Sequence, residues 1–408
     1  MSESATRFDI AIVGAGPAGL CMAVSLADTG LSVAVVDPAP DSTLADPPFD
    51  GREIALTHAS RSLLERLGVW VLLDPAEISA LRDAWVFDGN DPKPMRISHH
   101  DGGADQLGYL VPNHRIRACA FQVFRQLDAG CLFSDTRVAG VERGAESTSL
   151  RLDDGRVLTA RLVIAADGRF SSTRRAFGIA ARQRDFGRSM LVCRMALEQD
   201  HQHVAWEWFG RDQTLALLPL NHNQASAVIT LPHAEVQRLE GLEPAAFDRE
   251  ISARYQHRLG AMQLVSQRCV YPLVGVWPDR LVSPGFAAIG DAAVGMHPVT
   301  AHGFNLGLVS IEALSSRIQA ASRCGADFAS AQLLQAYQRE HRRHSLPLYL
   351  ATGAIVGLYT TISLPGRLLR RAALRSANRL PPFRRLIARS LTDRLTARRT
   401  DRLTNSRV

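Results

Sequence analysis

The sequence of 408 residues has few features of a secreted, metal-binding or repetitive protein. Its six cysteines are scattered, with no CxxC pair and no Cys/His cluster at metal-ligand spacing, so we expect reduced thiols in a cytosolic protein and no metal site. The N-terminus runs directly into an apolar stretch without a basic segment or a cleavage site, and therefore predicts no signal peptide. There is no internal repeat or low-complexity linker. The 46% hydrophobic content is typical of a packed globular chain that is long enough for two domains.

Lysine is nearly absent, and the arginines are unevenly distributed. Residues 366–408 hold thirteen arginines and two aspartates, a net +11 against +7 for the whole chain. In the simplest interpretation this segment is a solvated basic helix. In the alternative it contacts an anionic membrane surface or an acidic partner. We expect no nucleic-acid binding, because no basic motif interleaved with aromatic residues accompanies the charge.

One run of twenty residues, 346–365, contains no charged side chain. Its length would suit a membrane span. Its Thr, Ser and Gly residues and the prolines near its ends lower its hydropathy, however, so we predict a buried or surface-lying helix instead. Together with the basic segment, this makes 346–408 a helical C-terminal region that is a candidate for peripheral membrane contact.

The chain opens with a pattern typical of a βαβ unit. Residues 8–13 predict a buried strand, residues 17–29 a helix and residues 32–37 a second strand. Further helices are predicted at 61–67 and 113–127. A hairpin is predicted from strands 149–152 and 157–159, which the turn residues 153–155 connect.

A GxGxxG motif, Gly14, Gly16 and Gly19, joins the first strand to the first helix. The first glycine allows the turn, the second lets a pyrophosphate approach the helix N-terminus, and the third lets helix and strand pack closely. Asp37 ends the next strand, where a carboxylate can bind a ribose. The unit therefore predicts a dinucleotide site, with a glycine-rich structural turn as the alternative.

Two later strands end in Asp-Gly or Gly-Asp. The apolar strand at 162–166 ends in Asp167-Gly168, and the one at 286–289 is followed by Gly290-Asp291 and by a helix that begins near Gly303. An acid at a strand end can accept hydrogen bonds from sugar-chain hydroxyls. A helix N-terminus offers free N–H groups to a developing anion. An ordinary turn is the alternative at each place.

The middle of the chain has a different pattern. Short runs at regular spacing predict an antiparallel sheet, followed by a helix over 243–263 and a strand over 267–273; the runs are 190–197, 203–209, 214–220 and 224–231. Alternate residues in two of them share a face, and we expect this face to roof an apolar pocket, with plain core packing as the alternative; these residues are Val204, Trp206, Trp208, Leu215, Leu217 and Pro219.

Four motifs, in this order, make a specific resemblance. They are GAGPAG at 14–19, GREIAL at 51–56, AADG at 165–168 and GDAAVGMHPVTAHGFNLG at 290–307. Over roughly residues 7 to 345 the chain resembles flavin-dependent aromatic hydroxylases of the para-hydroxybenzoate hydroxylase fold. Within them it resembles the ubiquinone-biosynthesis hydroxylases, and its tail resembles that of the branch with broad ring-position specificity.

The resemblance implies an α/β fold with a Rossmann-type FAD-binding domain, an interleaved antiparallel β-sheet substrate domain and a helical C-terminal region. The discontinuous FAD-binding domain would comprise 1–75, 110–182 and 275–345. The substrate domain would comprise 76–109 and 183–274, and the C-terminal region 346–408.

The resemblance also implies cofactor-binding roles. Those for the dinucleotide half and the linker fall on Gly14, Gly16, Gly19, Asp37 and Asn113. Asp167 would lie near the pyrophosphate and help to admit NAD(P)H, and Asp291 would bind the ribityl chain.

Around the flavin ring the resemblance implies Arg52, Pro298, Gly303, Phe304 and Asn305. Arg52, Pro298 and His302 are the candidate catalytic residues. Two positions depart from the family pattern: Asp37 replaces a commoner Glu, and Ala301-His302 replaces Gly-Gln. His302 could tune the flavin edge or simply cap the helix. His58, His222 and His297 are further candidates for assisting a phenol.

The implied reaction is hydroxylation of an aromatic ring with NAD(P)H and O₂ through a C4a-hydroperoxyflavin, on a prenylated phenol or quinol of ubiquinone biosynthesis. Three alternatives stay open: a same-fold monooxygenase of a secondary-metabolite aromatic, a flavin-dependent prenyl reductase, and a non-enzymatic binder of prenylated partners. We expect a cytoplasmic protein, with the inner face of the cytoplasmic membrane as a peripheral site. The sequence leaves open the ring position, the tail length, the choice between NADH and NADPH, and the oligomeric state.

Overall fold

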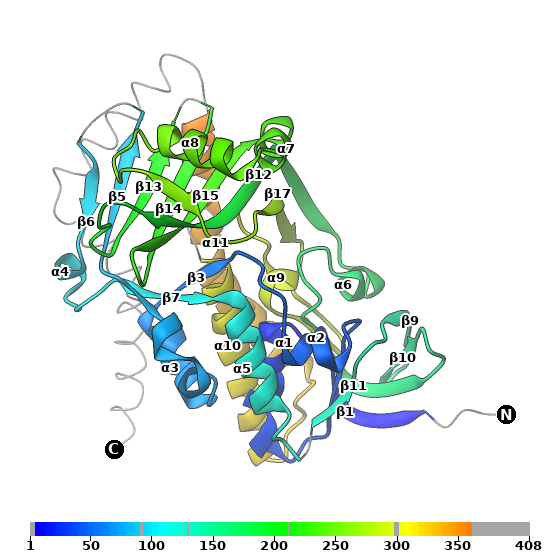
Figure 1. The fold of residues 1–408 in the computed structure, drawn as a ribbon. Coiled ribbons are helices and arrows are strands. Elements are labelled where there is room, and N and C mark those ends of the chain that lie inside the picture. Colours follow the sequence, from blue (N-terminus) through cyan, green and yellow to red (C-terminus); the bar gives the residue numbers. More distant parts are fainter. Residues whose placement is uncertain (1–4, 90–92, 129, 211, 298–301, 361–408) are drawn as a thin grey trace.

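The computed structural model describes residues 5–360 apart from 90–92, 129, 211 and 298–301 (Figure 1). These residues form two eight-stranded sheets and a three-stranded sheet. In Figure 1 the first large sheet lies in the lower part of the molecule and the second lies at the top. The predicted combination of a Rossmann-type layer with an interleaved antiparallel sheet is confirmed.

The first sheet is built on five parallel strands. Their order is β19 (Phe286–Ala288), β11 (Val157–Ala165), β1 (Thr6–Val13), β2 (Val33–Val36) and β8 (Gly130–Phe133). Three antiparallel strands extend it, namely β18 (Val282–Ser283) beside β19, β10 (Thr148–Leu152) beside β11, and β9 (Val138–Arg143) beside β10. All of β2 and the last four residues of β1 are buried, which explains their unbroken apolar runs.

One strand differs from its prediction. The sequence predicts separate strands at 157–159 and 162–166, but β11 is continuous. It pairs with β1 along its whole length, from Leu158 opposite Thr6 to Ala165 opposite Val13. Arg161, which lies between the two predicted strands, forms an ion pair with Asp327.

Helices cover the first sheet and link it to the rest. α1 (Pro17–Ser25), followed by the short η1 (Ala27–Thr29), connects β1 to β2 and contacts both α5 (Asn113–Phe124) and α10 (Gly303–Arg323) (Figure 1). The shorter helices are α2 (Asp41–Ala45), α3 (His58–Arg66), η2 (Trp70–Leu72), η3 (Pro75–Glu77), α4 (His99–Gly102), α6 (Ser172–Ala176) and α9 (Gly290–Ala293). The predicted helices near 17, 61, 113 and 303 are thus present.

The second sheet is antiparallel except for one parallel pair, β13 with β5. Its order is β16 (Met262–Leu264), β12 (Ala181–Leu197), β15 (Gln224–Pro232), β14 (Thr214–Leu220), β13 (Val204–Phe209), β5 (Asp83–Asp88) and β6 (Met95–Ile97), and β17 (Cys269–Pro278) also pairs with β12. The four predicted runs in the middle of the chain are all strands of this sheet.

The helix predicted over 243–263 was too long. α8 (Pro244–Arg254) ends where Gln256 and His257 adopt left-handed backbone angles, φ 56° and 52°, and the chain then turns back into β16. A second helix, α7 (His233–Glu240), was not predicted. The strand predicted over 267–273 begins at Cys269 and continues to Pro278.

The two faces of the second sheet have different partners. The outer face packs against α7 and α8, and its core includes Trp206, Trp208, Leu215 and Leu217. The expectation that these residues roof a pocket was therefore wrong, and the core-packing alternative holds for them. The inner face lies against the third sheet, which has the order β3 (Glu53–Leu56), β7 (Gly108–Pro112) and β4 (Ser79–Leu81).

The last described helix, α11 (Ala331–Thr360), includes the start of the charge-free run. Leu348 and Tyr349 pack against Trp277, whereas Leu346 and Leu350 are 42% and 60% exposed. A search of the described part of the chain found no helix with the length and hydropathy of a membrane span. Residues 361–408, with the basic segment, lie outside the described residues. All six cysteines are free thiols.

Candidate flavin site

The three glycines of the first loop have different surroundings. Gly14 has a φ of 110°, and a Cβ there would lie 2.5 Å from the carbonyl oxygen of Ala166. A Cβ on Gly19 would lie only 1.8 Å from the carbonyl oxygen of Gly14. A Cβ on Gly16 would meet no atom within 4 Å. The loop therefore leaves an open space at the N-terminus of α1, where a phosphate can bind.

Asp37 lies at the end of β2 beside this loop. One carboxylate oxygen accepts a hydrogen bond from the N–H of Ala15 at 2.6 Å, and the other accepts from Ala39 at 2.8 Å. The side chain thus holds the glycine loop in place. Each oxygen keeps a second lone pair that could accept a ribose hydroxyl.

Asp167 approaches the loop from β11, because a Cβ on Gly14 would contact its backbone nitrogen at 3.0 Å. Its Oδ2 accepts hydrogen bonds from the backbone and the hydroxyl of Thr173 at the start of α6. Its Oδ1 is buried and has no hydrogen-bond partner among the described residues. A buried acceptor without a partner is costly, which is a reason to expect a ligand at this place.

The late motif reaches the same place. Gly290 lies close to α1, since its Cβ would be 3.0 Å from the Cβ of Ala18. Asp291 is the next residue, and a Cβ on Gly303 would lie 3.9 Å from its Oδ1. Its Oδ2 accepts from the guanidinium of Arg169 at 2.8 Å. The glycine loop, Asp291 and the start of α10 are therefore neighbours.

Arg52 and Asn113 meet around a residue that sequence reasoning missed. Asp50 accepts hydrogen bonds from the Arg52 guanidinium and from the Asn113 amide, at 2.6 and 2.7 Å. Burial alone would raise the pKa of Asp50, but Arg52 and Asn113 outweigh it and lower the pKa. Arg52 also lies 5.5 Å from the ring centre of Tyr271, whose hydroxyl donates to the carbonyl of Asp50.

The charge of Arg52 is stabilised within this group. Burial opposes the charged form, but Asp50 outweighs burial and raises the Arg52 pKa, with smaller effects from Tyr271 and Asp291. The guanidinium is still 42% exposed. Arg52 is therefore a permanent cation that is electrostatically coupled to Asp291.

α10 presents its N-terminus beside Asp291. Gly303, Phe304 and Asn305 are its first residues, so their N–H groups have no partner within the helix. The Asn305 side chain ties the helix to the third sheet, because it accepts from the N–H of Thr57 and donates to the carbonyl of Ala55. His302 occupies the N-cap position, but its side chain makes no capping hydrogen bond. Pro298 lies outside the described residues.

The other candidate histidines lie in different surroundings. His58 hydrogen-bonds the carbonyl of Gln106 at 2.9 Å, and His222 lies in an exposed turn between β14 and β15. His297 packs edge-on against Phe186. Burial, with smaller effects from Arg169 and Arg184, lowers the pKa of His297 to about 4, so it is neutral at physiological pH.

Three further residues of this region were missed from the sequence. Arg169 pairs with Asp291, and Arg194 on β12 pairs with Glu53 on β3 at 2.7 Å. Burial raises the pKa of Glu53, and Arg194 offsets this only in part. Arg169 directly follows the Asp167-Gly168 motif, so its position in the sequence could have indicated a place at the site. Nothing in the sequence links Arg194 to Glu53, which lies 141 positions away.

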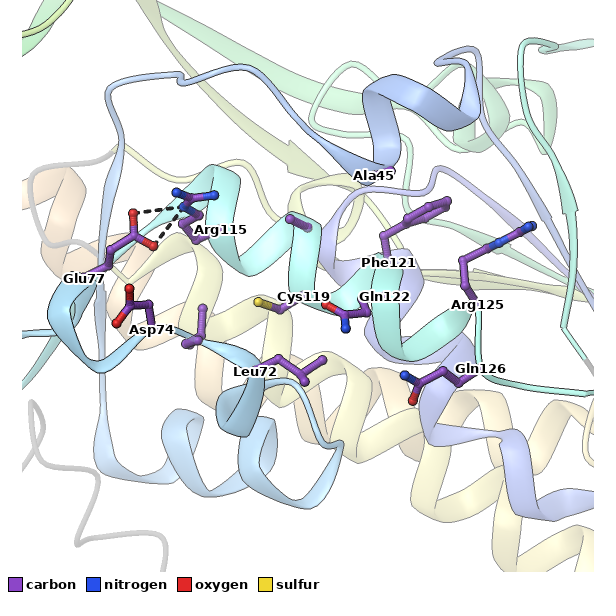
Figure 2. A pocket seen from close by; sticks show the side chains of 12 residues that line it. Ala45, Leu72, Asp74, Glu77, Arg115, Cys119, Phe121, Gln122, Arg125 and Gln126 are labelled. Atoms are coloured by element: carbon purple, nitrogen blue, oxygen red, sulfur yellow. Dashed lines mark hydrogen bonds and ion pairs between the residues drawn. The ribbon is translucent and has the colours of Figure 1, made fainter.

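A surface pocket of about 730 Å³ lies elsewhere, on the outward side of α5 (Figure 2). Arg115 forms an ion pair with Glu77 at its edge, and Cys119 and Gln122 line it. None of the predicted cofactor residues lines this pocket. The cofactor assignment therefore rests on the glycine and aspartate contacts described above.

A parallel sheet with an open GxGxxG loop, and three strand-end aspartates around it, define a dinucleotide-binding flavoprotein fold. The model of the FAD binding domain family matches residues 7–348. The chain therefore belongs to the FAD binding domain family.

Its relatives include ubiquinone-pathway enzymes. Ubiquinone hydroxylase UbiM of Neisseria meningitidis is 43% identical, over 94% of this chain and 84% of the relative. Ubiquinone hydroxylase UbiL of Rhodospirillum rubrum is 33% identical, over 93% and 88%. The 3-demethoxyubiquinol 3-hydroxylase of Escherichia coli is 29% identical, over 92% and 96%.

Solved structures confirm the fold. The p-nitrophenol 4-monooxygenase PnpA of Pseudomonas putida has a TM-score of 0.78 at 17% identity, covering 95% of this chain and 99% of that one. PqsL of Pseudomonas aeruginosa in complex with 2-aminobenzoylacetate has a TM-score of 0.75 at 23% identity, covering 89% and 98%. With these relatives, the chain is an FAD-dependent aromatic hydroxylase that uses NAD(P)H as reductant.

Proposed function

We propose that this enzyme hydroxylates the ring of a prenylated phenol or quinol in ubiquinone biosynthesis. The observation that carries the proposal is the 43% identity to a ubiquinone hydroxylase along nearly the whole chain. Reduced FAD, when bound, supplies the oxygen-activating chemistry. The protein must bind the cofactor, orient the ring and exclude water.

The site residues support specific roles in this reaction. Gly14, Gly16, Gly19, Asp37, Asn113 and Asp167 would hold the dinucleotide half and the linker, and Asp291 the ribityl chain. The N–H groups at Gly303, Phe304 and Asn305, with the cation of Arg52, would stabilise negative charge on the reduced flavin ring. Pro298 and His302 would border the same ring. The proposal includes a discontinuous FAD-binding domain over 1–75, 110–182 and 275–345, a substrate domain over 76–109 and 183–274, and a C-terminal region over 346–408.

Two exposed apolar side chains on α11 suit contact with a lipid surface. Leu346 and Leu350 are exposed on α11. They precede the basic segment at 366–408 in the sequence. We include in the proposal that the region from 346 onward contacts the inner face of the cytoplasmic membrane, where a polyprenyl substrate resides.

Complementation tests the function. The gene is expressed in an Escherichia coli strain that lacks 3-demethoxyubiquinol 3-hydroxylase, and quinones are profiled by mass spectrometry. We expect restored ubiquinone with the wild type and none with the Gly14→Ala/Asp291→Ala double variant. A purified yellow protein that hydroxylates small soluble phenols but neither restores ubiquinone nor turns over a prenylated phenol would contradict the proposal and favour a secondary-metabolite monooxygenase.

A further inference from the structure

The inner face of the second sheet has one ionisable side chain in the middle of an apolar row. Register places Glu207 on β13 between Val86 on β5 and Ala216 on β14. The row continues through Val228 on β15 and Val192 on β12 to Cys269 on β17. Because side chains alternate along strands, these residues share a face, opposite to Trp206 and Trp208.

This row leads toward the residues around Arg52. A Cβ on Gly51 would lie 3.2 Å from the Cβ of Cys269 and 3.4 Å from the carbonyl oxygen of Val192. Neighbouring strands are ~4.8 Å apart, so Glu207 lies roughly 14 Å from Val192 along the row. An aromatic ring can lie along such a span, between the loop at Gly51 and Glu207.

Several side chains of this row are partly accessible to solvent, unlike those on the outer face. On the outer face Leu215 and Leu217 are 1% and 0% exposed. On the inner face Glu207, Ala216 and Val228 are all partly accessible although they lie within the protein. A partly accessible apolar surface with a single polar group is what the wall of a ligand pocket requires.

The Glu207 carboxyl has no compensating partner. No hydrogen bond or ion pair joins it to another of the described residues. Tyr255 of the outer face interacts electrostatically with Glu207, but its hydroxyl donates to the carbonyl of Ala216. Farther along the inner face, Arg194 pairs with Glu53, and Tyr271 donates to the Asp50 carbonyl. Asp88 lies next along the face, opposite Phe209, and Arg96 lies over Trp85. Burial is the one cause that raises the Glu207 pKa well above its ordinary range.

We propose that the Glu207 carboxyl binds the ring oxygen substituent of the aromatic substrate and thereby sets the orientation of the ring. A neutral carboxyl donates one hydrogen bond and accepts another, which matches a phenol hydroxyl. A single polar group in an apolar wall fixes orientation. Glu207 then decides which ring carbon faces the reacting oxygen. This inference rests on the proposed function and specifies how its substrate is held.

Affinity for a matched ligand pair tests the inference. The probes are a phenol with a geranyl tail and its methyl ether, which cannot donate a hydrogen bond. Binding to the FAD-loaded protein is followed by the change in flavin absorbance. We expect the wild type to prefer the phenol by roughly tenfold, the worth of one buried hydrogen bond. Glu207→Leu should lose the preference, and Glu207→Gln, which also donates and accepts, should keep most of it.

Glu142→Gln, at an exposed position on β9, is the matched control and should behave as wild type. Far-UV circular dichroism and FAD content check that each variant folds. A preference that survives in Glu207→Leu overturns the inference, as does an equal loss in Glu207→Gln and Glu207→Leu. If the wild type binds both probes equally yet hydroxylates the phenol, the inference fails and the function stands. If the wild type binds neither probe, the proposed substrate class and this inference both fail.

Discussion

At the residue scale, the motifs bring together side chains and glycines whose surroundings differ from one position to the next. Gly14 and Gly19 are fixed by contacts within the protein, whereas Gly16 faces open space. Gly14 and Gly19 are thus required by packing within the protein, whereas in the proposed function Gly16 leaves room for the cofactor. The distinction can be measured, because a methyl group at each position has a different consequence.

Gly16→Ala should fold normally but bind FAD more weakly, by about tenfold or more, because its methyl group enters the space for the pyrophosphate. Gly19→Ala should lose stability itself, since its Cβ would lie 1.8 Å from a backbone oxygen. The measurements are FAD titration and the thermal unfolding temperature of the apoprotein. Equal FAD affinity of Gly16→Ala and wild type would show that the cofactor lies elsewhere.

Sequence motifs identify the residues of the loops but not the partners that assemble around them. Gly14, Asp167 and Asp291 could be predicted because each follows an apolar strand, and parallel strands end at one edge of the sheet. Asp50, Tyr271 and Arg194 could not, because their contacts depend on the approach of the second sheet to the third sheet and to the loop before it. Glu207 could not be assigned from the sequence either, since only the strand register shows that its neighbours are apolar.

At the scale of elements, period and turn residues predicted most strands, and the errors have physical causes. β11 is continuous because β1 pairs with it throughout. α8 ends early because two non-glycine residues adopt left-handed angles, which propensity does not reveal. The face of β13 and β14 was assigned wrongly because side-chain alternation shows which residues share a face but not which face α7 and α8 cover.

α11 offers a test at this scale. His341 is fully buried beside Tyr337, whose hydroxyl donates to the carbonyl of Ala288 in β19. Burial lowers the pKa of His341 to about 4, from an ordinary value of 6.5. The unfolded chain therefore binds an extra proton between these pH values, so stability falls as the pH decreases from 6.5 to 4.

Between pH 6.5 and 4, protonation of this one residue in the unfolded chain lowers the unfolding free energy by an amount on the order of 3 kcal/mol. His341→Gln should flatten this part of the pH dependence of the unfolding free energy, measured by urea denaturation. The exposed His257→Gln is the control. An unchanged slope in His341→Gln would mean that His341 is not buried in its neutral form.

At the scale of the whole molecule, a buried ion pair joins the second large sheet to the third sheet. It forms between Arg194 on β12 and Glu53 on β3, and the Glu53 side chain is 0% exposed. Breaking one side of a buried pair leaves a charge without a partner. The pair should therefore matter more for stability than the exposed ion pairs do.

Arg194→Met should lower the unfolding free energy by about 3 kcal/mol at neutral pH. Burial without Arg194 raises the Glu53 pKa further, so the loss should grow as the pH rises and shrink as the pH falls. Arg194→Met/Glu53→Gln should regain much of the loss in a double-mutant cycle. Additive effects of the two single changes would show that the pair does not couple the sheets.

The most direct measurement is the fate of oxygen atoms in the purified, FAD-loaded enzyme. It is supplied with NAD(P)H, a prenylated phenol and isotopically labelled dioxygen, and the product is analysed by mass spectrometry. We predict one labelled oxygen atom on the ring for each NAD(P)H consumed. Oxidation of NAD(P)H that yields only hydrogen peroxide, or a hydroxylated product whose oxygen comes from water, would contradict the assignment of this chain as a prenylphenol hydroxylase.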